Sequence, residues 1–312
     1  MGNDDRAFAQ ARGLTKSYGR HRGIVAVSFD LAEGEVLGFL GPNGAGKTTT
    51  LRTLMGLLRP TAGTATIAGL DCWSQAAQVK RLVGYLPGDF SFDPSLTGAQ
   101  ILAYLGHLRG GVDQTVVAGL AERLELDLGR RFRHYSHGNK QKVGLVQAFM
   151  HRPHLLILDE PTLGLDPLNQ QEFYRMIGEV RGEGRTVLLS SHILPEVERV
   201  CGRVAILREG RLVEVNQVSN LTHLRQQDVA VRFAAAASPE WFRGLPNVQA
   251  ATAADGGLQV HLRVQGDLEG VIKAAAQHGA TNIVTREPSL EEVFLRLYAE
   301  DRKPQAAAPA NQ

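Results

Sequence analysis

The sequence predicts an α/β protein in which a mostly parallel sheet carries helices on both faces, followed by a small α+β domain of the split βαβ type. Three features support this fold class. Up to about residue 219, fully apolar runs of strand length alternate with segments of helical period. A glycine-rich run separates one of these apolar strands from the helix after it. Beyond residue 222 the strands instead alternate apolar and polar residues, as half-buried strands do.

Strands of the first domain are expected where apolar residues run without interruption, at 36–40, 64–67, 82–86, 155–158, 186–189 and 203–207. Helices are expected at 48–58, 98–108, 116–124, 169–181 and 194–201. Because strands buried on both faces are continuously apolar, this alternation indicates a parallel sheet covered on both sides. We expect the domain to span residues 10–220, with a mainly helical part at about 88–151.

A second domain is expected at residues 222–300. Its predicted elements are a strand at 228–233, a short helix at 239–244, strands near 248 and at 257–264, a helix at 267–278, a strand at 282–285 and a last helix at 289–299. Apart from the last helix, this order is that of the split βαβ arrangement. The first dozen residues and a tail at 301–312, rich in Ala, Pro and Gln, are expected to be disordered.

The composition is that of an ordinary globular protein. The 34 Lys and Arg residues and 32 Asp and Glu residues leave a net charge of +2, so no nucleic acid partner is expected. Two cysteines, Cys72 and Cys201, are too few for a disulfide framework. We expect no signal peptide, and no run of about 18 apolar residues could span a bilayer. Membrane contact is therefore expected only through a partner.

A phosphate-binding loop is predicted between the strand at 36–40 and the helix after it. It matches G-x-x-x-x-G-K-[ST] and continues for one residue: Gly41, Pro42, Asn43, Gly44, Ala45, Gly46, Lys47, Thr48 and Thr49. Glycines let backbone N–H groups approach phosphate oxygens, and the helix N-terminus adds partial positive charge. Lys47 is expected to contact the β- and γ-phosphates and Thr48 to ligate Mg²⁺. The flanking strand and helix disfavour the alternative, a glycine-rich turn that carries a lysine by chance.

Two further strands end in residues suited to phosphate hydrolysis. Asp159 and Glu160 follow the strand at 155–158, and His192 follows the strand at 186–189 through two serines. Ligands gather at the carboxyl ends of parallel strands, so these side chains should lie beside the loop. We expect Asp159 to hold Mg²⁺, Glu160 to polarise the attacking water, and His192 to reach the γ-phosphate or orient that water. Taken alone, each would be read as a solvated or structural strand end.

A second anion site is predicted at Ser136, His137, Gly138 and Asn139, which open a helical segment. The Ser136 hydroxyl and the Gly138 N–H group lie at a helix start, where an anion binds favourably. A nucleotide on the first loop already has ligands for its phosphates, which suggests that this second set serves another subunit. The alternative is that Ser136 is simply an N-cap.

The order of these motifs resembles the ATP-binding cassette (ABC) family. The matching segments are a Walker A motif at 41–48, a signature at 135–141, a Walker B motif at 155–160, a D-loop that contains Asp166, the switch histidine at His192 and, at Tyr18, the aromatic residue that stacks on adenine. The resemblance implies a RecA-like P-loop NTPase core with a helical signature subdomain. It also implies ATP and Mg²⁺ as ligands and two cassettes that face head to tail around two ATP molecules.

Further segments resemble the ATPase subunits of bacterial drug and lipid exporters: residues 83–87, 97–98, 135–142 and 287–294. This resemblance implies two partners, a transmembrane permease subunit and a second copy of the chain or a paralogous cassette. It implies hydrolysis of ATP to ADP and phosphate, coupled to efflux of a drug, antibiotic or lipid at the cytoplasmic face of the cell membrane. The transported molecule would contact the permease, so this chain does not encode its identity.

The sequence departs from the family at two places. Gly88, followed by Asp89, stands where the family has Gln or Glu after a strand. Glycine cannot ligate Mg²⁺ or position water, so either Asp89 takes this role or the role is absent. In the signature, His137 replaces a glycine and Asn139 a glutamine, whereas Ser136 and Gly138 remain. The resemblance therefore still implies that two cassettes enclose the nucleotide.

An ABC ATPase that acts on the ribosome or on DNA is the main alternative function. Ribosome-acting relatives carry two cassettes on one chain, and DNA-repair relatives carry a long insertion between Lys47 and Asp159, which this chain lacks. A P-loop kinase would have no use for the Ser136 segment. For the second domain, two roles stay open: a stabilising appendage, or a regulatory element that holds the dimer.

Overall fold

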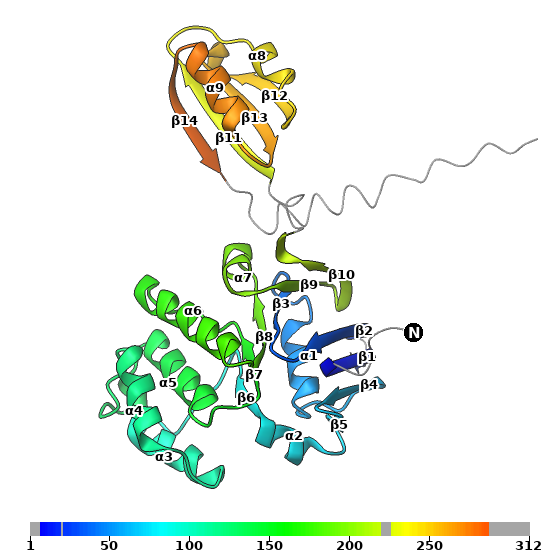
Figure 1. Cartoon of the computed structure of the whole chain (residues 1–312), viewed down its shortest axis with the longest axis vertical. Coiled ribbons are helices and arrows are strands. Elements are labelled where there is room, and N and C mark those ends of the chain that lie inside the picture. The colour runs from blue at the N-terminus through cyan, green and yellow to red at the C-terminus, as the bar shows by residue number, and fades with distance from the viewer. Residues whose placement is uncertain (1–6, 20, 220–225, 287–312) are drawn as a thin grey trace, which may run out of the picture. The chain divides into compact units, whose positions relative to one another are not determined.

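The computed structural model describes residues 7–19, 21–219 and 226–286, and the chain divides into two compact units, Met1–Val218 and Ser219–Gln312 (Figure 1). The first unit contains a six-stranded and a four-stranded sheet, and the second contains another four-stranded sheet.

The six-stranded sheet is mostly parallel, as predicted. Its strands are β10 (Arg211–Gln217), β9 (Arg203–Arg208), β3 (Val36–Leu40), β8 (Thr186–Ser191), β7 (Leu155–Asp159) and β6 (Val83–Leu86), in that spatial order. Neighbouring strands from β9 to β6 run parallel, whereas β10 pairs antiparallel with β9 at one edge. Every residue of β3, β7 and β8 is buried, which explains the apolar runs within these strands.

One face of this sheet packs on an antiparallel sheet and a helix. The antiparallel strands are β2 (His21–Ala32), β1 (Ala7–Tyr18), β4 (Ala62–Ile67) and β5 (Leu70–Asp71), and the helices of this part are α1 (Lys47–Leu54) and α2 (Ala76–Leu82). Alternate residues of the parallel strands, such as Phe39 and Ile157, share a core cluster with Leu14 of β1 and Leu51 of α1. The expectation that the first dozen residues are disordered is wrong from residue 7 onward, because β1 begins there.

Helices cover the opposite face. Figure 1 shows α5 (His137–Phe149), α6 (Pro167–Gly182) and α7 (Leu194–Val200) on this side of β6, β7 and β8. Helix α7 lies directly on β3, since a Cβ atom added at Gly38 would be 2.8 Å from Val197 and 2.9 Å from Cys201. The mainly helical part also holds α3 (Gly98–Leu108), α4 (Gln114–Arg123) and the 3₁₀ helix η2 (Phe132–His134). Helix α3 begins with a capping box between Thr97 and Gln100.

The second unit has the predicted β-α-β-β-α-β order. Its elements are β11 (Gln226–Phe233), α8 (Glu240–Arg243), β12 (Val248–Ala254), η4 (Asp255–Gly257), β13 (Gln259–Gln265), α9 (Glu269–Gln277) and β14 (Ala280–Arg286). The sheet order is β12-β13-β11-β14, and all three pairings are antiparallel. Alternate strand residues such as Val229 and Val260 form a core with Phe242 of α8 and Val271 of α9. The helix predicted at 289–299 lies outside the described residues.

None of the helices in the described ranges combines the length and the apolar composition that crossing a bilayer requires.

Candidate functional site

The parallel register brings the predicted motifs together at the carboxyl ends of the strands of the six-stranded sheet. Leu40, the last residue of β3, pairs with Ser191 of β8, and Asp159 of β7 pairs with Ser190. The loops that follow these strands therefore leave the sheet together. They border a cavity of about 310 Å³ that is lined by Gly23, residues 42–49 and Glu160. The structure thus joins the phosphate-binding loop with the end of the Walker B-like strand.

The loop is shaped to hold an anion. Helix α1 begins at Lys47 after Gly46, whose φ of 104° lies in the left-handed region that glycine adopts without strain. A Cβ atom at Gly41 would lie 2.3 Å from the carbonyl oxygen of Leu207, so only glycine fits there. The first α-helical hydrogen bond runs from the Thr50 N–H group to the Gly46 carbonyl. The earlier N–H groups at 47–49 thus have no intrahelical acceptor and are placed to donate to phosphate oxygens.

Two ionisable side chains line this cavity, and a third contacts one of them. The buried Lys47 ammonium donates to the Gly41 carbonyl at 2.6 Å and lies 3.1 Å from Oε1 of Glu160, as an ion pair without hydrogen-bond geometry. The other carboxylate oxygen of Glu160 lies 2.8 Å from Nδ1 of His192. The structure therefore joins the three predicted catalytic residues through the Glu160 carboxylate.

The backbone of Glu160 is strained. Its φ is 50°, in the left-handed region that residues other than glycine rarely adopt. The strained position is held by the Glu160 N–H group, which donates to the carbonyl and the hydroxyl of Ser190 at 3.2 and 3.1 Å. Left-handed residues of this kind cluster at functional sites, because the surrounding structure must fix them. Here the turn directs the carboxylate toward Lys47 and away from the buried strand.

Asp159 and Thr48 fit a Mg²⁺ ion. Asp159 is fully buried, and its Oδ1 atom accepts a hydrogen bond of 2.5 Å from the Ser190 hydroxyl. Within the described residues its Oδ2 atom has no partner, which suits an oxygen that ligates a cation. The hydroxyl of Thr48 and this carboxylate are the hard oxygen donors that Mg²⁺ prefers. The described residues contain no cluster of three or more His, Cys, Asp or Glu side chains that could hold a metal ion.

Gly88 lies beside the unpartnered Asp159 oxygen. A Cβ atom added at Gly88 would lie 3.0 Å from Oδ2 of Asp159. Any side chain there would crowd the carboxylate, so the glycine leaves room beside this buried oxygen. Asp89 is exposed and does not line the cavity, and its proposed replacement of the missing glutamine stays a prediction.

The signature segment begins a helix, as predicted, but not at the cavity of its own chain. The hydroxyl of Ser136, the N-cap of α5, accepts from the Asn139 N–H group at 3.2 Å. Ser136 is exposed, and neither it nor His137, Gly138 or Asn139 lines the loop cavity. Within a single chain, Ser136 therefore serves as the N-cap of α5.

The signature segment also contacts the D-loop-like turn. A Cβ atom at Gly138 would lie 2.4 Å from the Gly164 carbonyl oxygen, and one at Gly164 would lie 2.4 Å from Cδ2 of His137. The amide of Gln141 donates to the carbonyls of Glu160 and Pro161 at 3.0 and 3.1 Å. Sequence reasoning did not assign this role to Gln141. These contacts tie the start of α5 to the turn that carries Glu160.

Asp166 and Tyr18 occupy positions that suit their predicted motifs. Asp166 is the N-cap of α6, where hydrogen bonds from the backbone and side chain of Asn169 hold its pKa below the usual value. Tyr18 is 44% exposed, and a Cβ atom at Gly23 would lie 3.0 Å from its ring. Since Gly23 lines the cavity, the Tyr18 ring lies next to its rim, on the side of the loop.

Sequence reasoning missed one buried carboxylate. Glu196 of α7, only 8% exposed, accepts from the Thr162 hydroxyl at 2.7 Å and from the Ser191 hydroxyl at 2.8 Å. It therefore joins the segment after Glu160 to the residue before His192. The sequence does not distinguish it from Glu198, two positions further on, because only the packing of α7 shows which of the two is buried.

Comparisons with known proteins place the chain in one family. Residues 24–163 match the ABC transporter family. The chain is 31% identical to the linearmycin resistance ATP-binding protein LnrL of Bacillus subtilis (strain 168), covering 92% of this chain and 97% of that protein. It is 34% identical to the daunorubicin resistance ATP-binding protein DrrA3 of Streptomyces coeruleorubidus, covering 95% and 97%. Both alignments extend through most of the second unit.

Solved structures of ABC transporter cassettes share the fold of this chain. An ATP-binding subunit of an ABC transporter, 31% identical, superposes with a TM-score of 0.64 over 69% of this chain and 92% of that chain. A dimeric bacterial ABC transporter cassette, 21% identical, gives a TM-score of 0.61 and covers 67% of this chain and 98% of that chain, which bears on the fold alone. The fold predicted for the first domain is confirmed.

Proposed function

The chain belongs to the ABC transporter family as an ATP-binding ATPase subunit, and we propose that it drives a bacterial exporter of a drug, antibiotic or lipid. Its relatives LnrL and DrrA3 are described as resistance proteins, and the chain spans 97% of each. The observation that carries the mechanism is the contact of Glu160 with both Lys47 and His192 at the phosphate-binding loop.

In the proposed reaction, Lys47 and the N–H groups at the start of α1 hold the β- and γ-phosphates. A γ-phosphate bound by Lys47 lies beside Glu160, because the two side chains are 3.1 Å apart. Glu160 accepts a proton from the attacking water, and His192 orients the carboxylate through Oε2. Bound Mg²⁺ would neutralise charge on the phosphate oxygens, and Thr48 and Asp159 would hold it.

The second half of each nucleotide site is proposed to come from a second copy of the chain or a paralogous cassette. Ser136 and Gly138 lie at an exposed helix start that does not line the cavity of their own chain. A hydroxyl and backbone N–H groups at such a position are suited to a γ-phosphate that another copy presents. ATP then favours the closed pair, because its phosphates gain these contacts only in that state.

A transmembrane permease is the proposed partner, and the chain would work as a peripheral subunit at the cytoplasmic face of the membrane. The test is purification of the tagged chain from a detergent extract of membranes, followed by identification of retained proteins. Retention of a protein with several spanning helices, in equal amount to the chain, is the expected result. Retention of ribosomal subunits or DNA in its place would favour the alternative function.

For the second unit, we propose that it holds the dimer together. Its separate core, which includes Val229, Phe242 and Val260, supports a domain with its own stability. The test is deletion of residues 222–312 and measurement of the dimer yield with ATP. A lower yield is expected, and an unchanged yield would leave the unit as a stabilising appendage.

A further inference from the structure

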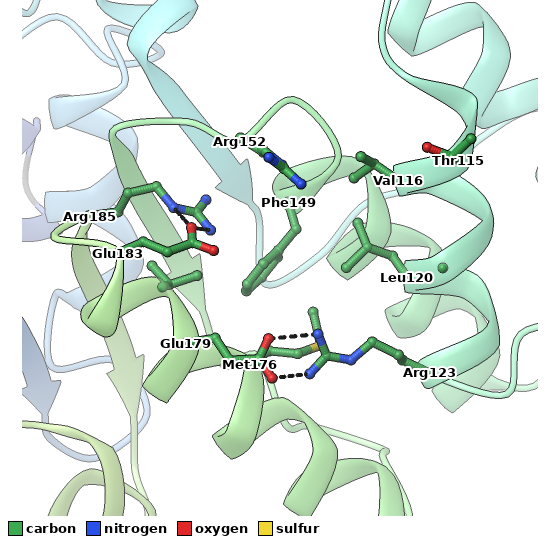
Figure 2. Close-up of a pocket in the computed structure, with 12 residues that line it drawn as sticks. Thr115, Val116, Leu120, Arg123, Phe149, Arg152, Met176, Glu179, Glu183 and Arg185 are labelled. Carbon is green, nitrogen blue, oxygen red and sulfur yellow. Dashed lines mark hydrogen bonds and ion pairs between the residues drawn. The ribbon is translucent and has the colours of Figure 1, made fainter.

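Figure 2 shows a second cavity, of about 400 Å³. It lies near the amino ends of β7 and β8, whereas the nucleotide site lies beyond their carboxyl ends. The second cavity is bordered by α4, α6 and the segments that precede β7 and β8. The nucleotide site lies beyond the carboxyl ends of these same strands, at Glu160 and His192. With about 3.3 Å per residue, five-residue strands separate the two places by more than 15 Å. This cavity is therefore a site of its own.

The lining combines an apolar wall with charged ends. The apolar members are Val116, Leu120, Phe149, Met176 and Val180, and the charged members are Arg123, Arg152, Arg185, Glu179 and Glu183. Figure 2 shows Arg152 and Arg185 at one end, above Phe149, and Arg123 with Glu179 at the other. The volume is within the range of small-molecule sites, and charged and apolar side chains contribute equally to the lining.

The charged groups at the lower end in Figure 2 satisfy one another. Arg123 donates to Glu172 at 2.6 Å and, through its two terminal nitrogens, to Glu179 at 2.7 and 2.8 Å. Such a bidentate pair is geometrically fixed. This end of the cavity therefore offers a ligand mainly apolar surface, from Leu120 and Met176.

The arginines at the other end are not balanced in this way. Arg185 contacts Glu183 through Nε at 2.8 Å and Nη2 at 2.7 Å, but its Nη1 atom is buried without a partner in the described part of the chain. A buried N–H donor without an acceptor is costly, and an external acceptor would remove that cost. No hydrogen bond or ion pair of the Arg152 guanidinium is found within the same residues. Glu183 thus pairs with Arg185, and the charge on Arg152 has only the longer-range attraction of Asp113.

Arg152 also sits on a strained backbone. Its φ is 47°, and its N–H group donates to the Phe149 carbonyl at 2.9 Å, where the chain turns from α5 toward β7. Glycine would adopt this conformation without strain. The Arg152 side chain therefore stands at the rim of the cavity at some cost in backbone strain.

We propose that this cavity binds a small amphipathic monoanion, a carboxylate with an apolar chain or ring. The carboxylate accepts hydrogen bonds from Nη1 of Arg185 and from Arg152, and the apolar part lies against Phe149, Leu120 and Met176. Of the guanidinium groups that line the cavity, those of Arg123 and Arg185 are paired with carboxylates, whereas that of Arg152 has only the longer-range attraction of Asp113, which leaves positive charge at this end for the ligand to balance. A dianion is disfavoured, because Glu179 and Glu183 would repel its second charge.

Decanoate is a suitable probe, and calorimetric titration of the full chain measures its binding. One molecule is expected to bind per chain. Decanol, which lacks the anion, and decyl phosphate at pH 8, which carries a second charge, are each expected to bind at least tenfold more weakly. Tighter binding of decyl phosphate would overturn the assignment to a monoanion. A decanoate Kd that rises in proportion to added ATP would place the probe at the phosphate-binding loop and overturn the separate site.

Three variants locate the binding. Arg152→Gly removes one anion ligand while it relieves the backbone strain, so it is expected to weaken decanoate at least tenfold without lowering the melting temperature. Leu120→Trp fills the apolar part of the cavity and is expected to weaken binding to the same degree. Arg181→Gln, an exposed residue of α6 that does not line the cavity, makes the same charge change and is expected to leave the Kd unchanged. Equal binding by all three variants and the parent chain would overturn the proposal.

Discussion

The Glu160 carboxylate lies 3.1 Å from the Lys47 ammonium at the start of α1. The two residues belong to different strand-to-helix connections, which the parallel pairing of β3, β8 and β7 brings together. A phosphate held by Lys47 is consequently beside the group that can take a proton from water. In the proposed mechanism, Lys47 therefore holds the phosphate, and the adjacent Glu160 acts in its hydrolysis.

Glu160→Gln is predicted to lower the ATP turnover number by about 10²–10⁴-fold, since an amide cannot accept the proton. Nucleotide affinity should stay within about threefold, because Lys47 and the loop N–H groups remain. Phosphate release and titration with a fluorescent ATP analogue measure the two quantities. Glu198→Gln, on α7, is the matched control and should behave as the parent chain. Turnover at the parent rate in Glu160→Gln would remove the role assigned to Glu160.

Glu196 is predicted to be a positioning residue that acts through its two hydroxyl partners. Glu196→Ala leaves the Thr162 and Ser191 hydroxyls without their acceptor, which should cost about 1–3 kcal/mol of unfolding free energy. We also expect a lower kcat with a KM near the parent value, because Ser191 precedes His192. Thr162→Val removes only one hydrogen bond and should show a smaller change in both. A stability loss in Glu196→Ala with kcat unchanged would reduce Glu196 to a purely structural role.

Gly88→Ala is predicted to raise the Mg²⁺ concentration needed for half-maximal ATPase activity. The added Cβ atom would lie 3.0 Å from the Asp159 oxygen proposed to hold the ion. Gly178→Ala in α6 is the matched control, since nothing lies within 4 Å of its added Cβ atom. That variant should keep the parent Mg²⁺ dependence and gain up to about 1 kcal/mol of stability. An unchanged Mg²⁺ requirement in Gly88→Ala would contradict the arrangement of Asp159 and Gly88.

The unfolding free energy should fall as the pH drops below about 6.5, in part because of His151. Burial, with the charges of Arg109 and Arg185, lowers the pKa of His151 from 6.5 to about 4. Between these values the unfolded chain binds more protons than the folded chain, so protonation favours unfolding, and the loss is complete below pH 4. With allowance for screening, we expect about 1–2 kcal/mol of this loss to disappear in His151→Phe. Urea unfolding at pH 7.5 and 5.0 gives the comparison, and equal losses in both chains would contradict it.

The sequence predicted the parallel sheet and the residues at its edge because both have strong local signals. Strands such as β3 and β7 are continuously apolar since they are buried on both faces, and Lys47 lies in a spaced motif. The β1–β2 hairpin was missed. Its two long strands pair through several irregular shifts of register, so that apolar residues such as Leu14 do not keep a simple alternation.

Contacts between distant segments could not be predicted from local patterns. The Gln141 amide reaches the Glu160 carbonyl, and Glu196 reaches the Thr162 hydroxyl, only because α5 and α7 pack on the same face of the sheet. Likewise, the sequence showed that Gly88 departs from the family pattern but not that it lies beside Asp159. Such roles depend on tertiary packing, which leaves no periodic trace in the sequence.

Sedimentation of Glu160→Gln with ATP and Mg²⁺, with and without Ser136→Arg, most directly tests the proposal that a neighbouring copy completes each nucleotide site. The single variant should sediment at twice the chain mass of 33.9 kDa. Ser136→Arg should return it to the monomer while each chain still binds one ATP. The larger cation would block only the contact between the signature of one copy and the ATP that the other copy binds. An ATP-bound dimer that persists in the double variant, or loss of ATP from the monomer, would contradict the shared site.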